Sequence, residues 1–435
     1  MENSDFWIYS NFSTKIIYIF TFVSMMLYVS RSISKRGLFS IENYFILFYF
    51  LIPILLMAPF AYSSYNLVAS GDFLRYRYLI NDSISISCFG ILSWLIGTFI
   101  SRGVTFSNLI IPKRISSYAN LFWFGFNNKY IKILMFFLVF LCIFYFLSLG
   151  VNFGEARGYG MENRDSRPLI NFFSAFFGFF FLYYLIFASV NKKIINLIAI
   201  FFLIVCSLFF GTRSSVVVPL IYLFFLINFV KDTKINFFSI IKIIFAMGLV
   251  IYLIVIISNY RDQANISILF SILYGNNFSD IRDFAWVLYG WKEGYLYGKT
   301  ELAGVLSFIP STLSDFRQTW SWGVYSTEIA DLDPTVHPGL RPGFFGESYI
   351  NFGLVGVFVL GFFSGFLIHQ YDTYIYLKKL KKENFNVVKL YAFGNIYLSI
   401  ISYFAITAGF STIYVILSIG LVFYLLKNTL TFKQY

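Results

Sequence analysis

SYINFGLVGVFVLGFFSGFLIHQY, residues 348–371, runs without an Asp, Glu, Lys or Arg. An uncharged apolar run of this kind is typical of a membrane-spanning helix, because about 20 helical residues cross the hydrocarbon core. The strands of an outer-membrane barrel are shorter and alternate in hydrophobicity, which this stretch does not. The run therefore predicts a helix that crosses a membrane.

The composition of the whole chain supports the same class. Of 435 residues, 58% are hydrophobic and only 12% are charged, and the mean hydropathy is +0.73. A soluble globular protein carries about 25% charged residues to solvate its surface. The sequence thus excludes a soluble domain and predicts an all-α, polytopic integral membrane protein.

Apolar runs separated by polar breaks predict about 11 transmembrane helices. The longest polar segment divides the chain into a block of about eight helices (1–258), a large outer loop (259–347) and a C-terminal block of about three helices (348–435). The expected spans are 10–30, 41–61, 79–100, 133–150, 169–190, 194–210, 215–230, 239–258, 348–371, 390–407 and 410–426.

The net charge of +12 is interpreted first as a topology signal, not as a nucleic-acid signal. The connections after spans 1, 3, 5, 7 and 9 and the C-terminus hold 20 of the 33 Lys and Arg, the opposite set holds 12, and Lys15 lies inside span 1. Cytoplasmic loops carry the excess of basic residues. The N-terminus and the long loop are therefore expected outside, and the C-terminus inside.

The two sides also differ in the type of basic residue. The cytoplasmic set has 16 Lys and 4 Arg, whereas the outer set has 10 Arg and 2 Lys beside seventeen acids. The planar guanidinium of arginine suits phosphate and carboxylate groups. The outer arginines therefore indicate anion recognition; the alternative is that they pair with the outer acids.

Arg213 is the sharpest single candidate for an anion site. It lies in Gly211-Thr212-Arg213-Ser214, between two short apolar runs. A charge near membrane depth costs several kcal/mol unless it is paired or hydrated. The following helix start would add its dipole to such a site. The alternative is an arginine that extends to the membrane interface.

The long outer loop contains a second set of candidates. Ile281, Phe284, Ala285 and Leu288 have helical spacing and predict an amphipathic helix at the outer interface, with Arg282 between two aspartates. Further along, aromatic rings beside an acid favour carbohydrate binding, although such rings are also ordinary residues of the membrane interface. These glycan candidates are Asp315, Trp320 and Trp322.

Glu347 is predicted at the outer mouth of the span at 348–371. The surrounding glycines, at 343, 346, 353 and 356, allow close backbone approach there. A carboxylate in this place can act as a general base. It can equally be a structural partner of Arg341 or Arg213.

Three short motifs carry a resemblance to a known family. They are Gly211-Thr212-Arg213-Ser214, the stretch from Tyr297-Gly298-Lys299-Thr300 to Ile309-Pro310, and Gly346-Glu347-Ser348-Tyr349-Ile350-Asn351-Phe352-Gly353. In these motifs and in its topology the chain resembles the oligosaccharide repeat unit polymerases, the Wzy-type O-antigen polymerases. The resemblance implies a multi-helix membrane glycosyltransferase of the bacterial inner membrane, with its active site facing the periplasm.

The resemblance implies substrates that are oligosaccharides linked to undecaprenyl diphosphate, with a chain-length regulator protein as a further partner. The diphosphate leaving group develops negative charge, which fixed guanidinium groups stabilise without a metal or a cofactor. Glu347 and His337 are the candidates to deprotonate or orient the acceptor hydroxyl. The diphosphate candidates are Arg213, Arg317 and Arg341, followed by Arg282 and Arg261.

Two other activities fit the same general plan. An O-antigen ligase would transfer the glycan to lipid A core, and a flippase would move the lipid-linked oligosaccharide across the bilayer. Transporters generally show paired halves and a charged central cavity. The sequence shows no internal repeat, and charged residues inside the predicted spans are scarce. Both features favour chemistry at the outer surface over transport.

Overall fold

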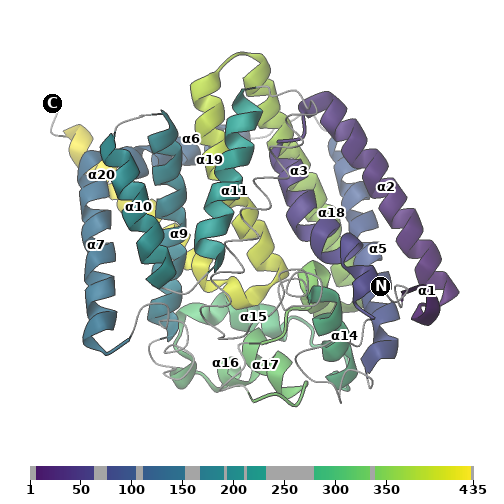
Figure 1. The fold of residues 1–435 in the computed structure, drawn as a ribbon. Coiled ribbons are helices and arrows are strands. Elements are labelled where there is room, and N and C mark those ends of the chain that lie inside the picture. The colour runs from purple at the N-terminus through teal and green to yellow at the C-terminus, as the bar shows by residue number, and fades with distance from the viewer. Residues whose placement is uncertain are drawn as a thin grey trace. The chain divides into compact units, whose positions relative to one another are not determined.

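A computed structural model describes residues 6–62, 76–103, 111–151, 167–190, 194–209, 213–231, 279–333 and 339–432 (Figure 1). Throughout these ranges the chain is largely helical, and they contain no strand. The prediction of an all-α protein is confirmed.

The chain divides into two compact units. The first unit comprises Met1–Phe106, Ile266–Tyr374 and Leu398–Ser411, and the second comprises Ser107–Asn265, Ile375–Tyr397 and Thr412–Tyr435. The long helices α18 (Gly343–Leu380) and α19 (Asn384–Ala405) each contribute residues to both units.

The other described elements of the first unit are α1 (Phe6–Tyr9), α2 (Phe12–Arg36), α3 (Ile41–Phe45), the π-helical η1 (Ile46–Leu56), η2 (Ala58–Phe60), η3 (Arg77–Leu79), α5 (Ile80–Ser101), α14 (Asp280–Gly290), α15 (Lys299–Val305), η6 (Leu306–Phe308), η7 (Ser311–Leu313), α16 (Asp315–Trp320), α17 (Trp322–Glu328) and η8 (Thr407–Gly409). The second unit is built from α6 (Ile111–Asn127), α7 (Lys129–Ser148), α9 (Arg167–Val190), α10 (Ile194–Phe209), α11 (Arg213–Val230) and nearly all of α20 (Ser411–Phe432).

Seven helical segments are long and apolar enough to cross a membrane, which supports a polytopic membrane protein. They are Phe12–Arg36, Ile41–Phe60, Arg77–Ser101, Lys129–Ser148, Gly343–Leu380, Asn384–Ala405 and Thr407–Thr429. Shorter apolar helices at Phe176–Ser189, Ile194–Cys206 and Val217–Val230 coincide with three further predicted spans. The predicted span at 239–258 lies outside the described residues, so the total of eleven and the placement of the loop stay predictions.

Helix α2 runs to Arg36, beyond the predicted end of the first span at residue 30, and local sequence signals mark both of its ends. Asn11 caps its start, because the side-chain oxygen accepts a hydrogen bond from the Thr14 backbone N–H at 2.8 Å. Gly37 follows the last helical residue and ends the helix. Its φ of 86° is a conformation that glycine adopts at little cost. Ser40 then caps α3 through the Asn43 N–H at 3.2 Å, so the chain turns within a few residues.

Small residues bring α5 and α18 into direct backbone contact in the first unit. A Cβ atom at Gly361 or Gly365 would collide with the backbone of Gly90 or Trp94, and one at Gly97 would collide with Phe362. Gly361 and Gly365 form a Gly-x-x-x-Gly pair, the spacing that lets membrane helices approach closely. This packing fixes α18 against α5.

The predicted amphipathic helix of the long loop is present as α14, but its apolar face is covered by protein. Ile281, Phe284 and Ala285 are all buried, and α14 packs against α5 and η3. These side chains therefore contact protein, and the position of α14 at the outer membrane interface stays a prediction.

Aromatic rings form much of the core of the second unit. Phe126 stacks on Tyr183 with ring centroids 4.4 Å apart, and the ring of Phe423 meets Phe126 edge to face at 5.0 Å. The hydroxyl of Tyr222 donates to the backbone carbonyl of Tyr391 at 2.7 Å. That hydrogen bond gives the hydroxyl of a fully buried tyrosine a partner.

Candidate functional site

Two of the three motifs that carry the family resemblance meet in the first unit. The backbone N–H groups of Leu296 and Tyr297 donate to the carbonyls of Ile350 and Asn351, at 3.1 and 3.0 Å. These carbonyls are available because α18 is interrupted at Gly353, where φ is 64° and ψ is −152°. The loop before α15 thus supplies hydrogen bonds that a broken helix lacks.

Asn351 joins the two motifs through its side chain. Its Oδ1 accepts from the Gly298 N–H at 3.1 Å, and its Nδ2 donates to Thr300 Oγ1 at 2.6 Å and to the Glu347 carbonyl at 3.0 Å. Gly298 has a φ of 85°, which favours glycine. Asn351 and Thr300 are fully buried, so these hydrogen bonds fix the contact away from water.

Glu347 lies beneath this contact with only 1% of its surface exposed. Its carboxylate accepts from the Thr407 backbone N–H at 2.9 Å and from the Thr407 hydroxyl. Thr407 opens the short helix η8 between α19 and α20, so its N–H lacks a helical partner and can bind the carboxylate. Neutral donors hold Glu347 here, not the alternative partner Arg341; the other alternative, Arg213, has no described side chain.

Glu301 is a second carboxyl group beside Glu347. It follows Thr300 in α15 and is half-buried. Burial and the nearby Glu347 carboxylate raise the pKa of Glu301 to about 8. A carboxyl group that titrates near neutral pH can both accept and donate a proton. Glu301 is not among the residues predicted from the sequence; its position directly after the Tyr297-Gly298-Lys299-Thr300 motif is the signal that points to it.

Arg282 and Arg341 lie together beside two acids. Asp283 accepts hydrogen bonds from the Arg341 backbone N–H at 3.3 Å and from Ser279 Oγ at 3.0 Å. Burial raises the pKa of Asp280 to about 6, against the opposing charge of Arg341. Burial also lowers the pKa of Arg282. Two of the predicted diphosphate arginines are therefore already close to carboxyl groups.

Arg317 lies on α16, within the same unit. Its guanidinium donates to the Ile309 carbonyl, and Ser314 Oγ accepts from the Arg317 backbone N–H at 3.3 Å. Burial lowers the pKa of Arg317, which is only half exposed. Fixing the guanidinium on a backbone carbonyl orients it but leaves further N–H groups for an anion.

The three glycan candidates have different surroundings. Asp315 is exposed at the start of α16, and the half-buried ring of Trp320 lies under Lys299 Nζ at 4.1 Å. Trp322 is buried, and its indole N–H donates to the Leu340 carbonyl at 2.9 Å. Trp322 therefore packs inside the protein and presents no face to a sugar.

Three other candidates lie where side chains are not described. Arg213 is the first residue of α11 in the second unit, but its side chain is outside the described set. His337 and Arg261 lie outside the described residues altogether. Their predicted roles stay predictions.

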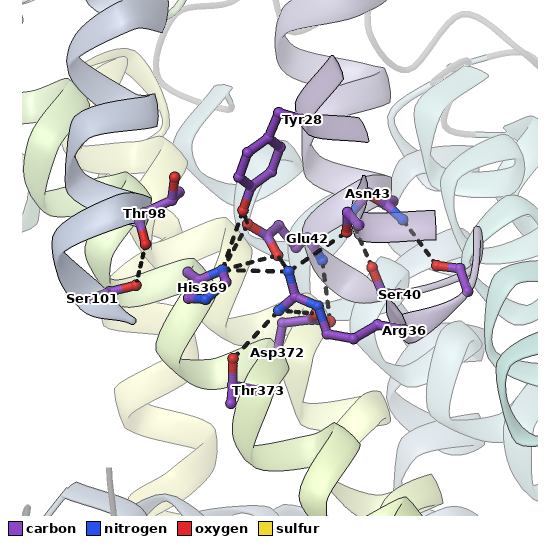
Figure 2. A network of polar contacts seen from close by, with 12 residues as sticks. Tyr28, Arg36, Ser40, Glu42, Asn43, Thr98, Ser101, His369, Asp372 and Thr373 are labelled. Atoms are coloured by element: carbon purple, nitrogen blue, oxygen red, sulfur yellow. Dashed lines mark hydrogen bonds and ion pairs between the residues drawn. The ribbon is translucent and has the colours of Figure 1, made fainter. Parts of the chain in front are cut away.

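A second buried polar cluster lies near the other end of α18 (Figure 2). Arg36 forms ion pairs with Glu42 and with Asp372, the latter at 2.9 Å between Nη1 and Oδ2. His369 Nδ1 lies 3.0 Å from Glu42 Oε1, and the Tyr28 hydroxyl also donates to Glu42. A guanidinium between two carboxylates satisfies charges that would each cost several kcal/mol if buried alone.

This second cluster was missed as a unit. Glu42 and Asp372 are two of only four acids on the predicted cytoplasmic side, and each adjoins an apolar run. An acid at such a place needs a partner. That requirement was the available signal, although it did not identify Arg36 as the partner.

Comparison with protein-family models, curated proteins and solved structures yields no match to this chain. The assignment of function rests on the residues and contacts described above.

Proposed function

We propose that the protein is a membrane glycosyltransferase that polymerises oligosaccharide repeat units carried on undecaprenyl diphosphate. It would transfer the growing glycan to a newly arrived, lipid-linked unit at the periplasmic face of a bacterial inner membrane. The observation that carries the proposal is the contact between residues 296–300 and 347–351, which brings two family-like motifs together around Glu347.

The proposed reaction needs one base and one stabilised leaving group. The acceptor hydroxyl oxygen bonds to the anomeric carbon of the growing chain, while the bond from that carbon to the carrier diphosphate breaks. The hydroxyl proton passes to a carboxylate, and the diphosphate leaves with the electron pair. Guanidinium groups already fixed in place stabilise the new negative charge with little reorganisation.

The carboxyl groups of Glu301 and Glu347 take different parts in this proposal. Glu301 is half-buried and has a pKa of about 8, so we assign it the proton-accepting role. Glu347 is enclosed and accepts hydrogen bonds from Thr407, so it positions the contact, and its nearby carboxylate strengthens the affinity of an ionised Glu301 for the transferred proton. Arg317 and Arg341 are assigned to the diphosphate.

Complementation of a deletion strain tests the proposal through the ladder of glycan lengths on the lipid. Deletion should leave lipid core capped with a single repeat unit, and the wild-type gene should restore the ladder. We expect Glu301→Gln to lower polymerisation by about 100-fold or more, the usual scale for losing a general base. Glu328→Gln changes an exposed acid on α17 and should leave the ladder unchanged.

The same gel separates the rival activities. Uncapped core with polymer still on its carrier would indicate a ligase, and loss of all outer-face product would indicate a flippase. A ladder unaltered by the deletion would refute the polymerase. Membrane levels of each variant, measured by immunoblot, distinguish lost chemistry from lost folding.

A further inference from the structure

An apolar groove of about 610 Å³ runs between α2 and α5, away from the site proposed above. Its walls carry exposed apolar side chains from both helices, and its end carries two arginines. The groove is lined by Phe20, Leu27 and Arg31 from α2, by Ile96 and Phe99 from α5, and by Arg102, which directly follows α5.

The groove has the length of one lipid leaflet. At 1.5 Å per residue, the helical distance from Phe20 to Arg31 is about 16 Å. The hydrocarbon core of a bilayer is about 30 Å thick, so one leaflet contributes about 15 Å. An acyl chain lying along α2 would therefore reach from the bilayer centre to the level of Arg31.

The basic end of the groove carries charge that nearby acids do not neutralise. Arg31 and Arg102 are exposed, and neither has an ion pair within the described part of the chain. The acids of this end of the first unit, Glu42 and Asp372, are both paired with Arg36 (Figure 2).

Tyr28 connects the groove to the buried ion cluster. Its ring lines the groove and lies 5.3 Å from the Arg102 guanidinium carbon, while its hydroxyl donates to Glu42. The hydrogen bond to Glu42 fixes the Tyr28 ring, and the face of that ring attracts the Arg102 guanidinium. The ring therefore orients Arg102 before a ligand binds.

One effect opposes an anion at this end. Arg102 follows the last residue of α5, where the helix dipole is negative and weakly disfavours an anion. A charge-assisted hydrogen bond to a phosphate is the stronger of the two effects, and two guanidinium groups are present. Attraction therefore outweighs the dipole.

We propose that this groove is a binding site for an anionic diacyl phospholipid of the cytoplasmic leaflet, with one acyl chain between α2 and α5 and its phosphate on Arg31 and Arg102. The distribution of Lys and Arg assigns these residues to the cytoplasmic side. Basic pockets between membrane helices on that side bind anionic headgroups. The proposal is independent of the glycosyltransferase.

The test compares the full-length protein in nanodiscs of phosphatidylcholine with and without phosphatidylglycerol. We expect phosphatidylglycerol to raise the unfolding temperature of the wild type, and native mass spectrometry to show retained phosphatidylglycerol. Arg31→Gln combined with Arg102→Gln should remove at least half of the temperature increment and the retained lipid. Lys35→Gln removes an exposed charge from the same end of α2 outside the groove and serves as the control.

Each alternative gives a different result. Equal losses in the double variant and in Lys35→Gln would mean general surface attraction and would overturn the site. Stabilisation by inorganic phosphate alone, or by undecaprenyl phosphate but not phosphatidylglycerol, would also overturn it. Both arginines are exposed, and the double variant is expected to fold in phosphatidylcholine as the wild type does, which the same unfolding measurement checks.

Discussion

The two buried acidic clusters on α18 hold their carboxylates by opposite means. Near His369, Arg36 neutralises Glu42 and Asp372 through ion pairs. Near Gly353, by contrast, Glu347 takes hydrogen bonds from Thr407 and has no ion pair among the described residues. Paired charges fix one arrangement, whereas a carboxyl group held by neutral donors can change its protonation without losing a partner. The first cluster is suited to stability and the second to chemistry.

Removing the central cation should give the largest effect. Arg36→Met leaves two carboxylates buried without their partner, which typically costs about 3–5 kcal/mol. Unfolding in detergent should therefore show a strong loss of stability, whereas Lys35→Gln should change it by less than about 0.5 kcal/mol.

A triple variant checks that the loss is electrostatic. Adding Glu42→Gln and Asp372→Asn to Arg36→Met should recover part of the stability, since no charge is then buried. If the triple variant is less stable than Arg36→Met alone, the ion pairs are not what holds this cluster.

Removing the neutral donor at the other end should give a smaller effect. Thr407→Val deletes the hydroxyl that donates to Glu347 but keeps the backbone N–H and the shape of the side chain. The cost should be about 1–3 kcal/mol, the scale for a buried acceptor that loses a partner. Thr319→Val, at an exposed position of α16, is the matched control for the same unfolding measurement.

Glu301 should make stability depend on pH. Its pKa is about 8 in the folded protein, well above the value of about 4.3 for an unperturbed glutamate. Between these two pH values the folded state therefore binds more protons than the unfolded state. The contribution of Glu301 to the free energy of unfolding is complete below about pH 4.3 and is lost as the pH rises through 8.

Unfolding temperatures between pH 5 and 9 measure this effect. Glu301→Gln should flatten the decline relative to wild type, and Glu293→Gln, an exposed acid of the same segment, should not. Identical slopes for wild type and Glu301→Gln would show that Glu301 is ionised throughout.

The smallest effect is expected from Lys299, two residues before Glu301 in the sequence. Lys299 lies over the Trp320 ring at 4.1 Å and is exposed. Lys299→Gln should cost about 0.5–1 kcal/mol, as for an exposed cation–π contact. A loss as large as that of Arg36→Met would mean that this end of α18 also depends on a cation.

The membrane class could be predicted from sequence because apolar runs persist over whole helices. The run at 348–371 lies inside α18, and other runs coincide with long apolar helices. The break at Gly353 could not be predicted, because many glycines of this chain lie in regular helix. What distinguishes Gly353 is the loop at 296–298, which pairs with the carbonyls beside it.

The candidate site was predicted only in part. The sequence singles out Glu347 at the predicted outer mouth of a span, but its partner Thr407 lies far along the chain and carries no charge to draw attention. In the sequence, Arg36 and Glu42 contribute only to the charge count of the predicted cytoplasmic side, because sequence alone does not show which opposite charges meet. Periodicity predicts helices, whereas side-chain partners depend on how those helices pack.

The contact between Glu347 and Thr407 also sets an order for biosynthesis. Residue 347 is translated before α19, and its two donors on Thr407 exist only after α19 has been made. Until η8 has been translated, the carboxyl group of Glu347 therefore lacks both donors. The α19–η8 turn completes the hydrogen bonding of an acid that was translated earlier, so truncation before residue 407 leaves Glu347 without these partners.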